Sequence, residues 1–578
     1  MKLRSKLHRA AYTALLASGA LATGAGLRAA AQQPARDSVT LPPGFSATVF
    51  ADGLGHARHI AVAPNGVVYA NTWSGPYYKN KPDDGGFLYA LKDNDGDGKA
   101  DVVERFGGTT KTGSAGGTGL EIHDGKLYAE MDDKIVRFTL PTDRIAPMGD
   151  PEVIVSGIPS TGDHPMHPFT IGKDGGLYIG VGSATNSCQP KNRMTGIKGA
   201  DPCVELETRA GVWRYDANKA GQTFSPKERY ATGLRNGEGL SFDADGRLFA
   251  TQHGRDQLAE SWGKLYTAKQ AAELPSEEVV EVKKGSDFGW PYCYYDPTQK
   301  KLVLAPEYGG DGGKEIGVCA GKQGPVAAFP AHWAPNDMEI YLSDLFPKAY
   351  QGGAFIAFHG SWNRAPAPQD GFNVVFQPLK DGKADGDYVI FADGFAGRIK
   401  EPGRAAHRPS GLTIGPDGTL YIADDQAGRI WKVTYAGDRS AKIEAAPRVT
   451  VAVGSAAMTP PPEGMDPNAG VTLPTPPGGN PEQVVLGGRI FRGEEAGGTC
   501  AGCHGGDAGG GPIGPSLTAG EWDWSDGSLA GLKKTILDGV PEPKKHPGAM
   551  PPMGGVELTG AQVDALAAYV WAIGHQKN

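Results

Sequence analysis

The amino-acid sequence predicts an all-β six-bladed β-propeller followed by a small all-α domain. Two observations predict the propeller: one hairpin pattern recurs along residues 32–445, and glycine, with 86 of 578 residues, is about twice as frequent as in an average protein. A third observation predicts the second domain, because the spacing of apolar residues becomes helical beyond a Pro- and Gly-rich stretch. A chain of this length can form two or more domains with substantial cores.

The repeated pattern is a short apolar run, a polar turn that ends in glycine, and a second apolar or aromatic run. It predicts two strands joined by an Asn-Gly or Asp-Gly turn. The spacing of the copies is typical of propeller blades lengthened by insertions. We count six copies, at 59–71, 119–131, 169–181, 239–251 and 411–423, with a looser one at 352–362. The alternative is a β-sandwich with similar hairpins, and the repeated aromatic-apolar-Ala ending argues against it.

The first 31 residues have the pattern of an export signal. Four basic residues precede a weakly apolar run: Lys2, Arg4, Lys6 and Arg9. The run ends in three alanines at 29–31. These are the charged, apolar and small-residue parts of such a signal. An uncleaved anchor is the alternative, but the run is rich in Gly, Ser and Thr and marginal in length for a span. We therefore expect a periplasmic or secreted protein without a stable membrane span.

Charge and cysteine content agree with that expectation. The formal net charge of −8 and the pI near 5.9 give no basic footprint, so we expect no nucleic-acid partner. Outside the C-terminal domain the chain has Cys188, Cys203, Cys293 and Cys319. An even number in an exported chain suggests disulfides, most simply 188–203 and 293–319, although four cysteines allow three pairings.

Residues 446–479 are predicted to form an extended linker, and residues 480–578 a helical domain. Within this domain, Cys500-Ala-Gly-Cys503-His504 is the attachment pattern of a c-type haem. Two thiols on one turn can bind the vinyl groups, and the adjacent imidazole can coordinate the iron. The alternatives are a chance CxxC, a thiol redox pair or half a zinc site, and no further zinc ligands lie nearby.

The C-terminal domain resembles the class I cytochromes c over residues 480–578. A predicted helix precedes the haem motif, and Thr559 and Gln562 form a capping box before the last helix. The distal motif of that family is a Met followed directly by Pro, which selects Met550 over Met553 as the sixth iron ligand. A thioether opposite the histidine raises the haem potential into the range used for electron transfer.

An acidic stretch, DNDGDGKADVVE (93–104), fits the calcium loop position by position. Alternating carboxylates offer oxygen atoms to a hard cation, and Gly98 permits the sharp turn. The expected calcium ligands are Asp93, Asp95, Asp97, Asp101 and Glu104. Because the flanking segments have strand character, we expect a calcium-binding blade loop rather than a helix–loop–helix. A solvated acidic turn is the alternative.

Loops at one propeller face carry residues suited to catalysis and to anion binding. Asp163 and His164 precede a predicted strand, and a histidine near a bound alcohol could remove its proton while a carboxylate orients the ring. Arginines beside turns on separate blades suit a polyanionic ligand. The alternatives are an ordinary loop histidine and surface arginines in ion pairs.

At these residues the resemblance becomes specific, because residues 40–435 resemble the soluble pyrroloquinoline quinone (PQQ)-dependent sugar dehydrogenases, especially the sorbosone and pyranose dehydrogenase branch. The resemblance rests on GDHPMHPFTIGKDGGLYIGVGS, LRNGEGLSFDADGRLFATQHG, SDFGWPYC, AFHGSWNR and HRPSGLTIGPDG. That family is a six-bladed propeller with PQQ over a calcium ion at one face. The resemblance implies that His164 is the general base supported by Asp163, and that Arg235 polarises the quinone carbonyl beside Asn236.

The resemblance also implies which residues hold the cofactor and its metal. Arg408 and Arg364 would bind PQQ carboxylates, and main-chain oxygens of Gly254 and Arg255 would bind the calcium ion. Two departures from the family pattern concern this part of the site. Ala406 stands where the family has a second basic residue, and Arg255 stands where a glucose-oxidising relative has proline. We therefore expect a different substrate pocket.

Together these features predict PQQ- and calcium-dependent oxidation of an aldose or aldehyde sugar, with electrons passing through haem c to an external acceptor. That acceptor would be a small cytochrome, a copper protein or a quinone. Two alternatives stay open. A calcium-dependent propeller hydrolase acting on sugar lactones would share the fold and the metal, and a non-catalytic sugar-binding propeller could carry an electron-transfer domain.

Overall fold

The computed structural model describes residues 39–74, 86–107, 117–364, 367–397, 400, 405–449, 472–493, 495–496, 500–511, 513–546 and 548–576. The predicted export signal and residues 450–471 of the predicted linker lie outside these residues. Within the described ranges, no helix combines the length and the apolar character needed to cross a membrane.

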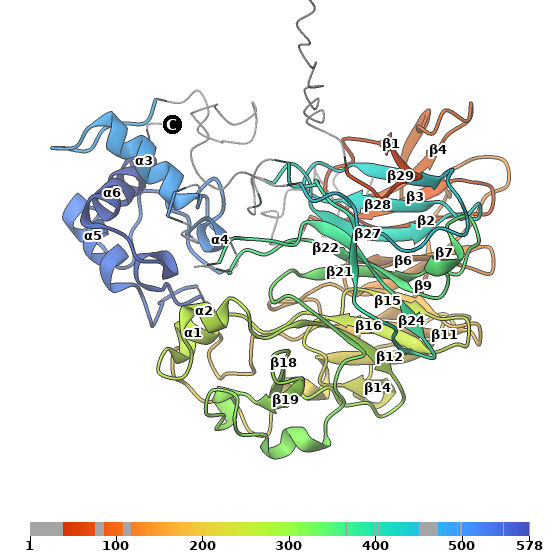
Figure 1. Cartoon of the computed structure of the whole chain (residues 1–578), viewed down its shortest axis with the longest axis horizontal. Helices are drawn as coiled ribbons and strands as arrows, with labels where there is room; N and C mark the ends of the chain where they lie inside the picture. The colour runs from red at the N-terminus through yellow and green to blue at the C-terminus, as the bar shows by residue number, and fades with distance from the viewer. Residues whose placement is uncertain are drawn as a thin grey trace, which may run out of the picture. The chain divides into compact units, whose positions relative to one another are not determined.

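Six sheets form the blades of the predicted β-propeller (Figure 1). Five blades are four-stranded and antiparallel, and the sixth gains a fifth strand because β13 joins β9 in parallel. The first blade in chain order contains β2 (Ala57–Val62), β3 (Val68–Thr72), β4 (Leu88–Lys92) and β5 (Val102–Phe106). The second contains β6 (Leu120–His123), β7 (Lys126–Met131), β8 (Lys134–Thr139), β9 (Glu152–Ser156) and β13 (Gln222–Thr223). The third contains β10 (Phe169–Ile171), β11 (Gly176–Val181), β12 (Gly211–Asp216) and β14 (Arg229–Thr232).

The remaining blades complete the ring, and short elements fill the loops between them. The next two contain β15 (Leu240–Phe242), β16 (Leu248–Gln252), β17 (Glu277–Val282) and β20 (Ala327–Phe329), then β21 (Pro335–Ile340), β22 (Ala354–Phe358), β23 (Asn373–Gln377) and β26 (Val389–Ala392). The short elements are η2 (Val204–Glu207), η3 (Pro226–Glu228), α1 (Leu258–Trp262), α2 (Ala268–Ala271), β18 (Cys293–Asp296), β19 (Lys301–Leu304), η4 (Pro306–Tyr308), η5 (Gly317–Gly321), η6 (Lys348–Tyr350), β24 (Leu379–Lys380) and β25 (Lys383–Ala384).

The last blade closes the ring with a strand from the other end of the domain. It contains β27 (Pro409–Ile414), β28 (Leu420–Asp424) and β29 (Ile430–Tyr435), and β1 (Phe45–Ala51) pairs antiparallel with β29. The Phe45 ring packs edge-on against Phe346 and Phe391, with ring centroids 4.8 and 4.9 Å apart. This aromatic cluster buries the junction of the two chain segments, so the blade holds the ring closed without a covalent link.

Five of the six predicted hairpins are confirmed, and the sixth prediction is wrong. In the hairpin β6–β7, Asp124 and Gly125 have φ angles of 46° and 69°, the left-handed pair that a two-residue turn requires. The segment 352–362 instead contains the single strand β22, which pairs with β21 across the long connection 341–353. Its apolar residues continue through one buried strand, so no turn forms inside the segment.

Both predicted disulfides are present, Cys188–Cys203 and Cys293–Cys319. The first closes a loop between β11 and β12, and the second ties β18 to η5. Cys500 and Cys503 are free thiols, which agrees with their assignment to haem attachment.

The C-terminal region is helical, as predicted, and is coloured blue in Figure 1. Its elements are α3 (Pro481–Phe491), α4 (Cys500–His504), α5 (Leu529–Asp538), η7 (Pro552–Gly555) and α6 (Gly560–Gly574). The predicted capping box of Thr559 and Gln562 is present at the start of α6. Helices α3 and α6 pack closely at Gly487, where a Cβ atom would lie 1.9 Å from the Ala565 carbonyl oxygen, so only glycine allows this contact.

Candidate active site and haem pocket

His164 lies in the loop before β10, and its side chain is buried. Its Nδ1 lies 2.9 Å from the Ser183 carbonyl oxygen and 3.0 Å from the Ser183 hydroxyl. A carbonyl oxygen only accepts, and that hydroxyl donates to the Thr185 carbonyl oxygen at 2.7 Å. Nδ1 therefore carries the hydrogen, and Nε2 keeps a lone pair that can accept a proton.

The charge state of His164 suits a proton acceptor. Burial and the positive charge of Arg235 together lower the pKa of His164 to about 3, against the opposing effect of the negative charge of Asp163. The imidazole is therefore neutral at neutral pH. A neutral ring with a fixed tautomer is the form that a general base needs.

Asp163 does not orient the His164 ring through a hydrogen bond, because Ser183 occupies that position. Its carboxylate instead accepts from Asn192 at 2.9 Å and from Arg193 Nη2 at 2.9 Å. Burial opposes ionisation of Asp163, but the charge of Arg193 outweighs it and lowers the pKa of the carboxyl. The support that Asp163 gives to His164 is thus electrostatic.

Arg235 and Asn236 lie directly beside His164. The Ser183 amide donates to the Arg235 carbonyl oxygen at 2.7 Å. At Gly182 a Cβ atom would lie 2.4 Å from the His164 Cβ and 2.8 Å from the Asn236 Oδ1. Glycine at this position is therefore what allows the predicted base and the predicted cofactor-facing amide to approach each other.

The guanidinium of Arg235 is buried and held from three sides. Nη2 donates to the Asn186 Oδ1 at 2.9 Å and to the Asp256 Oδ2 at 3.0 Å, and Nη1 donates to the Gly254 carbonyl oxygen at 2.9 Å. This arrangement places a fixed cation near His164. It also brings the carbonyl oxygen of Gly254, one of the predicted calcium ligands, into the same site.

Gly254 and Arg255 border a small cavity, whose other lining residues include Asn186, His253 and Trp290. The Gly254 amide donates to the Glu277 carboxylate at 2.8 Å, which fixes the orientation of this turn. The Arg255 side chain points elsewhere, into a buried ion pair with Glu307 at 2.5 Å. The side chain of Arg255 is therefore structural, and only its main-chain oxygen is a candidate ligand.

The two predicted carboxylate-binding arginines differ in their surroundings. Arg408 donates from Nε and Nη2 to the carbonyl oxygens of His359 and Gly360, at 3.0 and 2.9 Å. Arg364 donates to the Ala331 carbonyl oxygen at 2.8 Å and forms an ion pair with Glu273 at 3.0 Å. Glu273 neutralises the charge of Arg364, which weakens Arg364 as a candidate for binding an anion.

Arg58, a buried arginine in β2, is not among the site residues predicted from the sequence. Its Nη1 lies 2.6 Å from the Asp425 carboxylate, and its Nη2 lies 3.8 Å from the Glu238 carboxylate. The blade of β2 and the blade of β15, which Glu238 precedes, are three apart in the ring of six. This ion pair therefore crosses the propeller axis. The signal that could have found it is a charged residue inside an otherwise apolar inner strand, ARHIAV.

The acidic loop brings three of its five predicted ligands together. Among the described residues, Asp93, Asp95 and Asp101 form a group whose ligand oxygens all lie within 4.8 Å of one another. Asp97 and Glu104 are outside this group; Asp97 accepts from the Lys99 amide at 2.8 Å, and Glu104 lies within β5. The three grouped carboxylates fit the hard oxygen ligands that calcium prefers.

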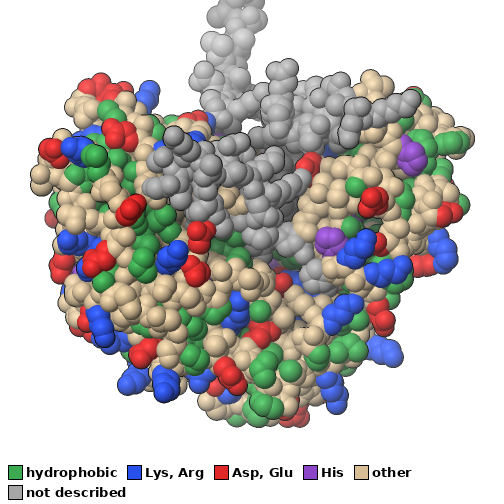
Figure 2. All heavy atoms as spheres, turned by 180° about the vertical axis from the view of Figure 1, so that it is seen from behind, with side chains coloured by type: hydrophobic (Ala, Val, Ile, Leu, Met, Phe, Trp, Pro, Cys, Tyr) green, Lys and Arg blue, Asp and Glu red, His purple; other side chains and the backbone are tan. Residues whose placement is uncertain are grey.

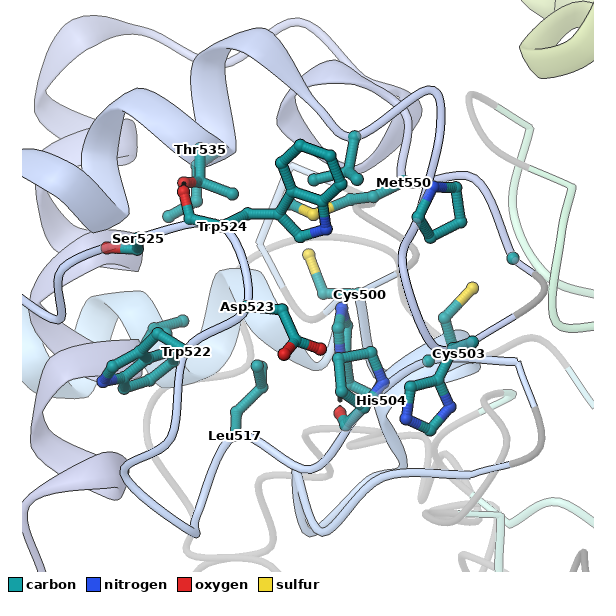
Figure 3. A pocket seen from close by; sticks show the side chains of 18 of the residues that line it. Cys500, Cys503, His504, Leu517, Trp522, Asp523, Trp524, Ser525, Thr535 and Met550 are labelled. Atoms are coloured by element: carbon teal, nitrogen blue, oxygen red, sulfur yellow. Dashed lines mark hydrogen bonds between the residues drawn. The ribbon is translucent and has the colours of Figure 1, made fainter. Parts of the chain in front are cut away.

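The haem motif lines a large cavity in the helical region (Figure 3). The cavity has about 1170 Å³ of space free of protein atoms, and its wall includes Cys500, Cys503, His504 and Met550. Met553 is not among the lining residues, which agrees with the choice of Met550. Apolar side chains complete the wall, including Leu532, Ile536, Leu566 and Val570. Two thiols, an imidazole and a thioether around one apolar cavity fit a c-type haem.

The His504 ring is oriented for iron binding. Its Nδ1 donates to the Pro515 carbonyl oxygen at 2.9 Å, which leaves Nε2 with the lone pair that coordinates a metal. Burial raises the pKa of Cys500 to about 11 and that of Cys503 to about 12. Both thiols are therefore neutral at neutral pH, which argues against a reactive thiolate pair.

Charged side chains of both signs lie on the face drawn in Figure 2. Lys and Arg side chains alternate there with Asp and Glu, and no area of one sign dominates. This agrees with the net charge of −8 for the whole chain.

Known proteins resemble the two parts of the chain separately. A PQQ-dependent pyranose dehydrogenase of Coprinopsis cinerea is 26% identical over 231 residues, which are 34% of this chain and 30% of that protein. The cbb3-type cytochrome c oxidase subunit FixP of Rhizobium etli is 39% identical over 77 residues, 13% of this chain and 26% of that protein. The chain thus spans well under half of the length of these two curated relatives.

Solved structures agree on the propeller fold. A Trichoderma reesei enzyme of carbohydrate-active family AA12 has a TM-score of 0.55 and 17% identity, covering 69% of this chain and 98% of that one. The PQQ domain of the C. cinerea pyranose dehydrogenase, in its holo form, has a TM-score of 0.53 and 18% identity, covering 69% of this chain and 97% of that one. At this identity the likeness shows the fold alone.

Family models match both parts. Residues 487–570 match the model described as subunit III of cbb3-type cytochrome c oxidase, and this stretch contains the haem motif. Residues 39–436 match the model described as TrAA12-like. Since this second match covers most of the chain and the whole propeller, the chain belongs to the TrAA12-like family.

Proposed function

We propose that this protein is a PQQ- and calcium-dependent sugar dehydrogenase that passes electrons from its propeller to its own c-type haem. The observation that carries the proposal is the juxtaposition of a neutral, tautomer-fixed His164 with the buried cation Arg235. Ser183 links the two residues by two hydrogen bonds: its carbonyl oxygen accepts from the His164 ring, and its amide donates to the Arg235 main-chain carbonyl oxygen. The C. cinerea pyranose dehydrogenase, a relative of the propeller, uses PQQ by its name. The substrate proposed here is an aldose or aldehyde sugar.

The propeller residues fit a polyanionic quinone. Arg235 and Arg408 lie on two different blades, and Arg235 is buried. Guanidinium groups bind carboxylates through paired hydrogen bonds, and PQQ is a tricarboxylate. Arg408 directly precedes β27 and donates to the main-chain carbonyl oxygens of His359 and Gly360.

Bound at this face, PQQ would supply a quinone that accepts a hydride from the carbon that bears the reacting hydroxyl group of the sugar. The task of the protein residues is to move a proton and to stabilise charge. His164 Nε2 accepts the hydroxyl proton of the substrate, and the hydrogen bonds to Ser183 hold the ring in place while it does so. Arg235 stabilises negative charge that develops beside it, because its position is fixed before the reaction begins.

We propose two calcium sites. The Gly254 and Arg255 carbonyl oxygens are the candidate ligands at the cofactor face, and the Glu277 carboxylate fixes the turn that carries them. The grouped carboxylates of Asp93, Asp95 and Asp101 are the candidate ligands in the blade loop. The first ion would hold the cofactor, and the second would stabilise the loop between β4 and β5.

The haem pocket supplies the route by which electrons leave. His504 and Met550 would coordinate the haem iron, and a haem held by both would transfer electrons without binding substrate. The oxidation of an alcohol releases two electrons. An external small cytochrome, copper protein or quinone would take them from the haem. Disulfides and covalent haem attachment both belong to oxidising compartments, so we propose a periplasmic or secreted location.

A reconstitution experiment tests the proposal. Apoprotein is mixed with PQQ and Ca²⁺, and the reduction of an artificial dye is followed with a panel of aldoses. Dye reduction that needs both additions supports the dehydrogenase. Activity that survives chelation, with no quinone in a denatured extract, contradicts it. Hydrolysis of a sugar lactone without PQQ would favour the propeller hydrolase, and sugar binding without either reaction would favour a non-catalytic propeller.

A further inference from the structure

One buried arginine, which no sequence motif indicates, connects the two halves of the proposed site. Arg193 lies in the loop between β11 and β12 that the Cys188–Cys203 disulfide closes. Its side chain is 3% exposed. Its backbone has a φ angle of 61°, a left-handed conformation that costs energy for a residue with a Cβ atom. A strained, buried and charged residue of this kind needs a reason to be there.

The guanidinium of Arg193 bridges two carboxylates from different blades. Nη2 lies 2.9 Å from the Asp163 Oδ2 and 3.0 Å from the Asp256 Oδ2. Nη1 donates to the Gln257 Oε1 at 3.0 Å. Asp163 is the neighbour of the proposed base His164, and Asp256 follows the Gly254-Arg255 turn. The disulfide-closed loop thus places one cation between the loops before β10 and after β16.

The bridge continues to the arginine that faces the proposed reaction. The Asp256 Oδ2 also accepts from Arg235 Nη2 at 3.0 Å, and the Asp256 Oδ1 accepts from Asn363 at 2.9 Å. Asp163, Arg193, Asp256 and Arg235 therefore form one chain of alternating charges, with two carboxylates and two guanidinium groups. The chain is electrically balanced, which is the condition under which buried charges are tolerated.

We propose that Arg193 is a positioning residue, which acts through Asp163 on His164 and through Asp256 on Arg235. Through Asp256 it fixes where the Arg235 guanidinium lies. Through Asp163 it neutralises the carboxylate that faces His164. This inference rests on the proposed function, because only a reaction at His164 and Arg235 gives the bridge a purpose.

Removing Arg193 has a defined electrostatic consequence. The charged and titratable groups that face His164 are Arg235, Asp163 and His253. Without Arg193, the negative charge of Asp163 is no longer neutralised, and it favours the protonated form of His164. The acid limb of the kcat/KM profile, where the base is lost by protonation, should then move to higher pH. A residue that merely supports the fold would lower the amount of active protein without moving this limb.

The test compares the wild type with three full-length variants, each loaded with haem, PQQ and Ca²⁺, in dye reduction with a good sugar across pH. Arg193→Gln is expected to lower kcat/KM by about tenfold to a hundredfold, the scale of a small misplacement of catalytic groups, and to shift the acid limb upward. Arg193→Gln with Asp163→Asn should return the limb toward the wild-type position, because it removes the uncompensated charge. The matched control is Arg214→Gln, which breaks an exposed pair with Asp174 in the same blade and should change neither quantity.

The possible results separate this inference from the proposed function. If the wild type reduces no dye, both are wrong. If the wild type is active and Arg193→Gln matches it in kcat/KM and in the acid limb, only the positioning role is wrong. Should Arg193→Gln fail to fold, Arg193→Lys keeps the charge but loses the planar fork that reaches two carboxylates. A folded Arg193→Lys enzyme should lose about tenfold in kcat/KM, and wild-type kcat/KM in that variant would overturn the inference.

Discussion

His164 Nδ1 lies 2.9 Å from the carbonyl oxygen of Ser183. Because a carbonyl oxygen only accepts hydrogen bonds, this contact determines which ring nitrogen carries the hydrogen and leaves Nε2 as the basic atom. Ser183 thus orients His164 from within the blade to which both residues belong. The same residue reaches the neighbouring blade, since the Ser183 amide donates to the Arg235 carbonyl oxygen.

Replacing the base should abolish most of the turnover. His164→Ala is expected to lower kcat by a factor on the order of 10² to 10⁴, the usual range for the loss of general-base catalysis. PQQ affinity should stay nearly unchanged, because the arginines hold the cofactor. Steady-state dye reduction and a fluorescence titration with PQQ measure the two quantities. An unchanged kcat would transfer the role to another histidine, such as His253, which lines the neighbouring cavity.

The pH dependence of the wild type should reveal how deeply the base is buried. Burial lowers the pKa of His164 to about 3, so the neutral, active form is present above that value and is lost as the pH falls through it. The acid limb of kcat/KM should therefore lie well below pH 6.5, the ordinary histidine value. A limb near 6.5 that disappears in His164→Ala would contradict the buried environment seen here.

The choice between the two methionines can be tested on the haem potential. Met550→Ala removes the thioether opposite His504 and should lower the midpoint potential, because a thioether ligand favours the reduced iron. Met553→Ala is the matched control, since Met553 does not line the cavity. Spectroelectrochemical titration of the haem band measures both variants. A lower potential in Met553→Ala alone would reverse the assignment.

The acidic loop should bind calcium mainly through its three grouped carboxylates. Addition of Ca²⁺ is expected to raise the Tm of the wild type, because an ion that binds only the folded state stabilises it. Asp93→Asn should remove most of the contribution from this loop, and Asp97→Asn should remove less, because Asp97 lies outside the group. Thermal unfolding at increasing Ca²⁺ checks this. If both variants lose the same part of the Ca²⁺-induced increase in Tm, the ion does not bind preferentially to the grouped oxygens.

Local patterns in the sequence predicted most of the fold. Turn residues such as Asp124 and Gly125 fix their hairpins within a few residues, and the Thr559 capping box marks the start of α6 in the same way. The pattern at 352–362 failed because a buried strand is apolar on both faces, so a continuous apolar run does not reveal where the strand ends. Its partner β21 lies across a connection that no local signal describes.

The candidate site was predictable only where a motif names its residues. His164, Arg235 and His504 stand in recognisable strings, and the structure places them in positions that suit their expected roles. The partner of His164 was not predictable, because Asp163 is adjacent in sequence but turns toward Arg193, whereas Ser183 comes from the far end of a strand. Arg58 and Arg193 were missed for the same reason, since their partners lie on other blades.

The central claim is that one polypeptide oxidises a sugar and delivers the electrons to its own haem. The most direct test is stopped-flow absorbance of the haem band after the oxidised protein, loaded with PQQ and Ca²⁺, is mixed with a good sugar substrate. A linker of about thirty residues holds the two domains at an effective concentration near millimolar. The haem should therefore become reduced at a rate that does not depend on protein concentration. A haem that stays oxidised while an added dye is reduced, or that is reduced in proportion to protein concentration, would contradict the account.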